Sequence, residues 1–290
     1  MLSSNTLSQQ RNDKYLVLLF KALALITGTF SLLIVLFILL ESLPALRFSG
    51  LYSFFNDRAW YPVENLFNLS PMLFASVFSA LGAILLAAPL GIVVAIFCNY
   101  YAPPSLAWLF TRLIELLSGI PSVVFGFWGL VVLVPWVDEI SPPGASLLSG
   151  ILIISLMILP TMALSADSVF KSFPSLQLQA ASALGISRSG TIFRLILPAT
   201  WRPLFSGLIL QVGRALGETM AILMVAGNVV QIPKSIFDPV RTLTANMALE
   251  MAYAVGNHRS ALFVSGLVLM LLVITLMSLA DYFERGSHEN

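Results

Sequence analysis

The sequence predicts an all-α polytopic membrane protein, with six transmembrane helices and one long cytoplasmic loop. The 290 residues are 58% hydrophobic and 10% charged, whereas typical soluble domains are about 25% charged. The mean hydropathy is +0.92, and so few charges could not cover the surface of a soluble fold. Apolar windows also recur along the chain at the length of about 20 residues that a helix needs to cross a bilayer.

The composition excludes several classes of function. A net charge of +1 gives no basic field for binding nucleic acid. The single cysteine, Cys98, allows neither an intrachain disulfide nor a cysteine-based zinc site. The two histidines, His258 and His288, fall in polar segments, so catalysis by a metal or by a Ser-His-Asp triad is poorly supplied. We therefore expect no catalytic residues, no metal site and no bound cofactor on this chain.

One membrane domain, residues 22–283, is expected between a cytoplasmic segment, 1–21, and a cytoplasmic tail, 284–290. Its six expected spans are residues 22–40, 71–98, 116–137, 147–166, 201–225 and 261–280. The first run is too long for the apolar region of a signal peptide and is followed by no cleavage site, so it is expected to be an anchor. Segment 238–255 is moderately apolar but polar at intervals, which predicts either a short helix or a re-entrant segment.

Lysine and arginine are unevenly divided between the two sets of loops, and this bias predicts the orientation. With the N-terminus inside, nine lie on the cytoplasmic side: Arg11, Lys14, Lys21, Arg112, Lys171, Arg188, Arg194, Arg202 and Arg285. Five lie outside: Arg47, Arg58, Lys234, Arg241 and Arg259. Both termini are therefore expected in the cytoplasm.

Gly119, Pro121 and Ser122 interrupt the third expected span. Pro121 lacks an N–H group and disfavours helical geometry at the residue before it. Free backbone groups at membrane depth are tolerated only against protein or a water-filled cavity. The interruption predicts either the lining of a polar pathway or an ordinary kink.

The fifth expected span carries two charges, Arg214 and Glu218. A charge near the membrane midplane costs roughly 2.5–3.5 kcal/mol on insertion scales, so Arg214 should face a partner or water. Residues four apart share a face of a continuous helix, which would allow the two charges to neutralise each other. Alternatively, Arg214 faces a passing anion and Glu218 prevents it from trapping that anion. Gly213 and Gly217 form a small-xxx-small pair that allows close helix packing.

The long cytoplasmic loop, residues 167–203, predicts two short helices. Residues 176–184 form the first, which Gly185 ends, and Ser187 caps a second that runs over 187–197 before Pro198. The first is expected either to lie on the bilayer surface or to dock a soluble partner. Residues 185–191 imitate a phosphate-binding loop but lack its lysine and do not follow a strand, so ATP is not expected to bind here.

This loop resembles the coupling motif of ABC importer permeases, which is usually Glu-Ala-Ala, three residues, Gly, and an Ile-x-Leu-Pro-like ending. The matching residues are Gln179, Ala180, Ala181, Gly185 and Pro198. Gln179 stands where the motif usually has glutamate, so this position lacks the charge for an ion pair with the ATPase.

Three further segments resemble the PstC type of phosphate-importer permease. They are residues 119–126, residues 213–221 followed by 224–228, and residues 242–250. The resemblance covers most of the chain from about residue 70 onward. In that family, the residues matching Arg214 and Glu218 are associated with transport.

The resemblance implies the type I importer permease fold in a bacterial inner membrane. It also implies a PstA-type second permease, a dimeric ABC ATPase that binds ATP and Mg²⁺, and a periplasmic or lipid-anchored phosphate-binding protein. Phosphate would be the transported substrate. A permease for sulfate or molybdate is the nearest alternative, followed by a secondary transporter and then a membrane enzyme. Secondary transporters often contain inverted repeats, which this sequence does not show.

Overall fold

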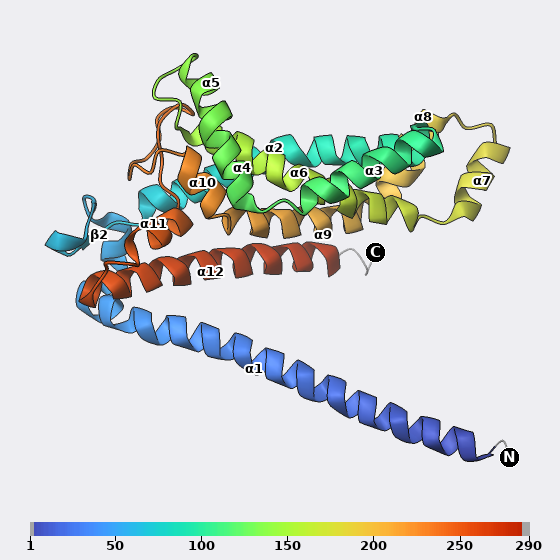
Figure 1. Cartoon of the computed structure of the whole chain (residues 1–290), viewed down its shortest axis with the longest axis horizontal. Coiled ribbons are helices and arrows are strands. Elements are labelled where there is room, and N and C mark those ends of the chain that lie inside the picture. Colours follow the sequence, from blue (N-terminus) through green and yellow to red (C-terminus); the bar gives the residue numbers. More distant parts are fainter. Residues whose placement is uncertain (1–2, 286–290) are drawn as a thin grey trace.

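The computed structural model describes the backbone of residues 3–285 and the side chains of residues 16–278. His288 and the tail beyond residue 285 lie outside the described residues. The described part is mostly helical, and most of the long helices run back and forth between two ends (Figure 1). We call the end that carries the two short strands the hairpin end, and the opposite end, which carries α7 and α8, the connection end.

The elements are α1 (Ser3–Asn56), β1 (Trp60–Tyr61), η1 (Pro62–Glu64), β2 (Leu66–Phe67), α2 (Ser70–Ile96), η2 (Phe97–Tyr101), α3 (Pro104–Ser118), α4 (Ser122–Trp128), η3 (Gly129–Leu133), α5 (Val134–Asp138), α6 (Leu147–Lys171), α7 (Ser175–Ala183), α8 (Arg188–Thr191), η4 (Ile192–Ile196), α9 (Leu197–Leu216), α10 (Met220–Val225), α11 (Leu243–Glu250) and α12 (Gly256–Arg285).

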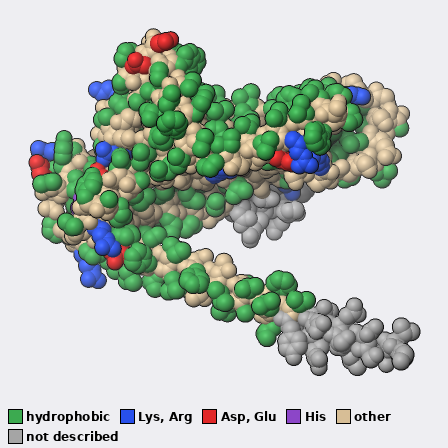
Figure 2. Space-filling model, in the orientation of Figure 1, with side chains coloured by type: hydrophobic (Ala, Val, Ile, Leu, Met, Phe, Trp, Pro, Cys, Tyr) green, Lys and Arg blue, Asp and Glu red, His purple; other side chains and the backbone are tan. Residues whose placement is uncertain are grey.

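The prediction of a six-span helical membrane protein is confirmed. Within the described residues, five helical stretches are long and apolar enough to cross a membrane. A sixth span forms if α3 and the helix that starts at α4 are taken together, and this pair is bent by 93°. The visible surface between the two ends is largely hydrophobic, as lipid contact requires (Figure 2).

The pairing of α2 with α6 forms the centre of the helical bundle. Alanines of α2, including Ala80, Ala83 and Ala87, are buried in the main core. Gly82 allows an equally close approach, because a Cβ atom there would lie 2.6 Å from Cδ1 of Ile151. Small residues let helix backbones approach closely, which is how helices associate where lipid removes the hydrophobic driving force.

The first helix is longer than expected and stands apart from the bundle. It runs to Asn56 with a break at Gly50, whose φ is +71°. It meets α12 near the hairpin end, where the rings of Phe37 and Phe263 pack edge to face, and then diverges from it (Figure 1). Its apolar side chains from Leu16 to Leu40 are largely exposed, so this helix presents a lipid- or partner-facing surface.

The third span begins earlier than residue 116, because α3 starts at Pro104. Gly119 ends α3 and Pro121 directly precedes α4, so the interruption predicted at these residues is present as a sharp bend. The span is thus two half-helices rather than one kinked helix.

The fifth span also differs from the prediction. The helix expected over 187–197 does not end before Pro198 but continues through η4 into α9, giving one span from Arg188 to Leu216. A π-helical turn precedes Pro198, and the N–H of Leu197 bonds to the carbonyl of Ile192. This turn rearranges the hydrogen bonds just before the residue that lacks an N–H, so the proline does not stop the helix. The connection outside the spans is therefore residues 172–187, shorter than 167–203.

Candidate functional site

The fifth expected span breaks where its charges lie. We expected one helix over 201–225, but α9 ends at Leu216 and α10 begins at Met220. Glu218 therefore lies in the break, and its Oε1 accepts a 3.0 Å hydrogen bond from the backbone N–H of Ala221. This bond satisfies one of the free N–H groups at the start of α10.

Arg214 and Glu218 consequently do not form the mutual pair that a continuous helix would allow. The ion pairs between described side chains do not include one between them. Arg214 is exposed although the next two residues, Ala215 and Leu216, are buried. The Arg214 side chain is thus accessible one turn before the break.

The two glycines beside these charges have different surroundings. A Cβ atom at Gly213 would lie 3.0 Å from Cε of Met277, so this residue allows α9 to pack closely on α12. Gly217 instead ends α9, and the nearest atoms to a Cβ there belong to the preceding turn. Close packing between helices is therefore present at Gly213 and not at Gly217 within the described residues.

The two broken spans meet through their second halves. A Cβ atom on Gly126 of α4 would lie 2.8 Å from Cα of Ala221 in α10. Three residues further on, a Cβ atom on Gly129 would lie 2.9 Å from the side-chain atom Cγ1 of Val225. The half-helices that follow Ser122 and Thr219 therefore run side by side in the same direction, with α10 beside α4 (Figure 1).

The connection end carries the residues of the coupling motif. The predicted helix 176–184 is confirmed as α7, Ser175–Ala183. Gly185 follows with a φ of +69°, and the Ser187 hydroxyl accepts a 3.2 Å hydrogen bond from the N–H of Gly190 to cap α8. The remaining motif residues are placed as follows: Gln179 and Ala180 are exposed on α7, Ala181 is buried, and Pro198 lies in the first turn of α9.

One side of α7 faces away from the protein and is apolar. Leu176 is 76% exposed and Leu184 is 79% exposed. They lie in register with exposed Ala180, at a spacing of four residues. The opposite side of α7 packs inward through Leu178 and Ala181. This arrangement leaves an apolar stripe at the connection end that no part of the described chain covers.

A polar cluster at the hairpin end was missed by sequence reasoning. Glu250, the last residue of α11, is 7% exposed. Its Oε1 accepts a 2.7 Å hydrogen bond from Nη1 of Arg241, its Oε2 accepts one of 2.9 Å from Nε1 of Trp60, and Nε2 of His258 lies 2.8 Å from Oε2. The signal available in the sequence was Glu250 itself, which ends the segment 242–250 that resembles the family. Its partner Trp60 could not be found in this way, because it lies 190 residues away in sequence.

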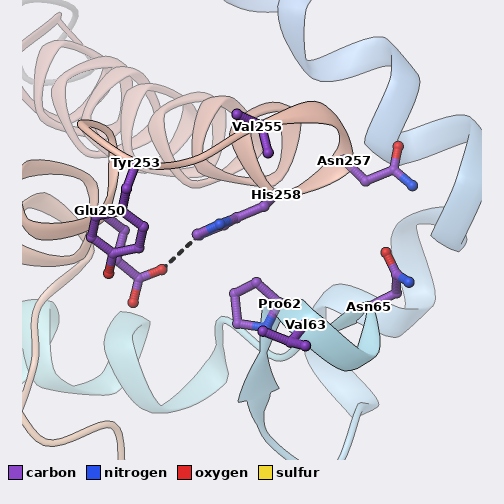
Figure 3. Close-up of a pocket in the computed structure, with 8 residues that line it drawn as sticks. All are labelled: Pro62, Val63, Asn65, Glu250, Tyr253, Val255, Asn257 and His258. Carbon is purple, nitrogen blue, oxygen red and sulfur yellow. Dashed lines mark hydrogen bonds and ion pairs between the residues drawn. The ribbon is translucent and has the colours of Figure 1, made fainter.

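A pocket of about 540 Å³ opens beside this cluster. One wall is the segment that contains Pro62, Val63 and Asn65, and the other is the segment from Glu250 to His258 (Figure 3). His258 extends across the pocket floor toward Glu250 (Figure 3). The segment 238–255 thus contains a short helix, one of the two forms expected for it, and contributes to this pocket.

Residues 87–288 match the family described as "Binding-protein-dependent transport system inner membrane component". The chain belongs to this family of ABC importer permeases. It is therefore a multi-pass membrane transport subunit rather than an enzyme, and membership implies an ATPase and a substrate-binding protein as partners.

Individual relatives give a narrower likeness. The chain is 33% identical to the phosphate transport system permease protein PstC of Mesorhizobium japonicum, over 80% of this chain and 77% of that protein. It is 36% identical to the probable ABC transporter permease protein YqgH of Bacillus subtilis, over 90% of this chain and 87% of that one. A probable PstC of Methanocaldococcus jannaschii is 30% identical over 89% of both chains.

Solved structures support the fold. An inward-facing structure of the MetNI methionine ABC transporter matches 75% of this chain and 93% of its own with a TM-score of 0.58. A structure of an amino acid ABC transporter matches 74% of this chain and 91% of its own with a TM-score of 0.55. At 16% and 15% identity these likenesses concern the fold alone. The prediction of the type I importer permease fold is confirmed.

Proposed function

We propose that this chain is a permease subunit of an ATP-driven importer for inorganic phosphate, and that Arg214 lines the route of the anion. The observation that carries the proposal is the exposed guanidinium one turn before the break in the fifth span, in a chain whose relatives include PstC proteins. A second permease of the PstA type completes the route.

The physical argument starts from the cost of exposing a charge to lipid. A charged side chain at the centre of a spanning helix costs roughly 2.5–3.5 kcal/mol on insertion scales, and Arg214 lies within the fifth span, so it must face protein or water. Glu218 does not pair with it among the described side chains, and Oε1 of Glu218 instead accepts a hydrogen bond at the start of α10. Arg214 therefore offers a single cation to a passing anion, which gives a weak stop rather than a tight site.

The non-helical backbone at the breaks in the third and fifth spans supports a route for the anion beside these breaks. Gly119–Pro121 and Gly217–Thr219 leave backbone groups outside helices within two spans. Such groups are tolerated at membrane depth only against protein or along a water-filled cavity. We assign Gly119, Pro121 and Ser122 to the wall of this route.

The exposed stripe on α7 is assigned to the ATPase. Leu176, Ala180 and Leu184 present an apolar surface of helical spacing, which suits a groove on a soluble partner. Gln179 and Gly185 flank the stripe, and the partner ATPase would bind the ATP and Mg²⁺. Because the ATPase is cytoplasmic, the connection end and both termini face the cytoplasm. The hairpin end then faces the extracytoplasmic phosphate-binding protein.

The test is purification of the tagged chain from its native membrane in mild detergent, followed by reconstitution into vesicles. We expect a P-loop ATPase and a second permease of similar size to co-purify and ATP-dependent uptake of labelled phosphate to follow. Excess sulfate or molybdate should compete poorly. Equal competition by sulfate or molybdate would favour the oxyanion alternative, and a chain that purifies alone and transports without ATP would favour a secondary transporter.

A further inference from the structure

Helix α11 is short, yet it buries an unusual number of polar side chains. Thr244, Asn246 and Glu250 within it are each at most 7% exposed, and so is its N-terminal cap, Thr242. A buried polar group costs free energy unless it is hydrogen-bonded, and most of these bonds lead to other parts of the fold. The placement of α11 is therefore fixed by directed contacts at both of its ends.

The first end of α11 holds the break in the fifth span. The Thr244 hydroxyl donates a 2.8 Å hydrogen bond to the backbone carbonyl of Glu218. The backbone N–H of Leu243 donates a 3.0 Å bond to the hydroxyl of Ser76 in α2. Because the carboxylate of Glu218 bonds to α10, its carbonyl and its side chain are both fixed, one by α11 and one by α10.

The last residue of α11 is held by the cluster at the hairpin end. Glu250 connects to the first strand through Trp60, to α12 through His258, and to the segment before α11 through Arg241. Arg241 also donates from Nε to the carbonyl of Asn228, at 2.9 Å, which ties the segment after α10 to the same cluster. No other titratable side chain bonds to Glu250 among the described residues.

We propose that α11 is a strut through which Glu250 positions Glu218. Thr244 and Glu250 are six residues apart, which is about 9 Å along a helix, so the two ends of α11 cannot move independently. A displacement of the hairpin at Trp60 would shift Glu250, and α11 would carry that shift through Thr244 to the break beside Arg214. Glu250 and Thr244 are positioning residues in this proposal, which rests on the proposed function.

The pocket makes the Glu250 end of α11 accessible. Its two walls are the hairpin segment and the segment that joins α11 to α12, and Glu250 and His258 belong to its lining (Figure 3). Any change in the separation of these walls alters the surroundings of the Glu250 carboxylate. The cluster is thus placed to respond to events at the hairpin end.

The test is a double-mutant cycle between Thr244 and Glu250 in the complete importer, reconstituted with its binding protein. Thr244→Val keeps the shape of the side chain but removes the donor to Glu218. In the wild-type chain, Trp60 and Arg241 each donate to a different carboxylate oxygen of Glu250. Glu250→Gln leaves only one side-chain oxygen to accept from these two donors. We expect each variant to lower the rate of phosphate uptake by about tenfold, and the double variant to be no slower than the worse single variant. Two independent sites this far apart would instead give multiplied losses.

Controls separate positioning from loss of structure. Thr244→Ser retains the hydroxyl and should restore uptake, while Glu64→Gln, on the same hairpin but outside the cluster, should leave it unchanged. If Glu250→Gln fails to assemble, Trp60→Phe replaces it in the cycle, since it removes the Nε1 donor and keeps an aromatic ring at this position.

Three results would overturn the proposal that α11 links Glu250 to Glu218. They are multiplied losses in the double variant, wild-type uptake by Thr244→Val, and no rescue by Thr244→Ser. A failure of the proposed function is distinguishable, because the wild-type complex itself would then not take up phosphate. In that case the same cycle is measured on ATP hydrolysis stimulated by the binding protein, and multiplied losses there would again overturn the strut.

Discussion

Gly126 of α4 and Ala221 of α10 bring two broken spans into backbone contact, since a Cβ atom on Gly126 would lie 2.8 Å from Cα of Ala221. The contact atom is backbone and cannot rotate away. Each half-helix follows a break in its own span, at Gly119–Pro121 and at Gly217–Thr219. The glycine therefore keeps the two breaks in a fixed relation.

Gly126→Ala should separate these half-helices. Overpacking of a well-packed site typically costs about 1–3 kcal/mol, so we expect a lower thermal unfolding temperature and a smaller yield of folded protein in detergent. Gly119→Ala is the matched control, because a Cβ atom there makes only ordinary contacts, the nearest at 3.5 Å. Equal stability of the two variants would show that α4 and α10 do not pack as described.

Arg214→Gln should reduce phosphate uptake while leaving the complex assembled. The side chain is exposed, so its loss opens no cavity in the chain, but the passing anion loses its cation. We expect a fall of about tenfold or more in the uptake rate, equivalent to about 1.4 kcal/mol. Arg112→Gln, which changes an exposed arginine of α3, serves as the control. Unchanged uptake by Arg214→Gln would remove this residue from the mechanism.

Variants of Glu218 should separate the effect of its hydrogen bond to the N–H of Ala221 from the effect of its negative charge. Glu218→Gln retains a side-chain oxygen for the N–H of Ala221, so assembly should persist. Its uptake should fall, because Arg214 then holds the anion longer without a nearby negative charge. Glu218→Ala removes the oxygen as well and should cost about 1 kcal/mol of stability, as other helix caps do. The comparison is made by uptake and thermal unfolding on the same preparations, and identical unfolding of the two variants would argue against the cap.

The stripe on α7 should bind the ATPase. Leu176→Ala combined with Leu184→Ala removes apolar area that is already exposed, so the isolated chain should fold normally. We expect the affinity for the ATPase to fall by about tenfold or more, measured by the amount of ATPase retained in pull-down. Gln177→Ala changes an exposed residue of the same helix outside the stripe and should have no effect. Full retention by the double variant would favour a helix that lies on the bilayer.

Local signals explain what the sequence predicted well. Hydropathy located the six spans, although not the bounds of the third and fifth, because spanning a bilayer demands long apolar runs whatever their neighbours are. The bend at Pro121 and the bounds of α7 followed from proline and glycine chemistry that acts within a few residues.

The break at Glu218 could not be predicted in the same way. Gly213–Ala221 contains no proline, and its pattern suits a continuous helix. The break is held by Thr244, which is 26 residues further along the chain. In the Glu250 cluster, Arg241 and His258 are nine and eight residues away, but Trp60 is 190 residues away and only the fold brings it to Glu250. Distant contacts of this kind leave no periodicity in the sequence.

We propose that this chain is the phosphate-conducting permease subunit of an ATP-driven importer. The most direct measurement is labelled phosphate accumulated in vesicles that hold the ATPase, the second permease and the binding protein, prepared with and without this chain. We expect ATP-dependent accumulation only when the chain is present, with little loss in excess sulfate. Accumulation without the chain, or none with the complete set, would contradict it.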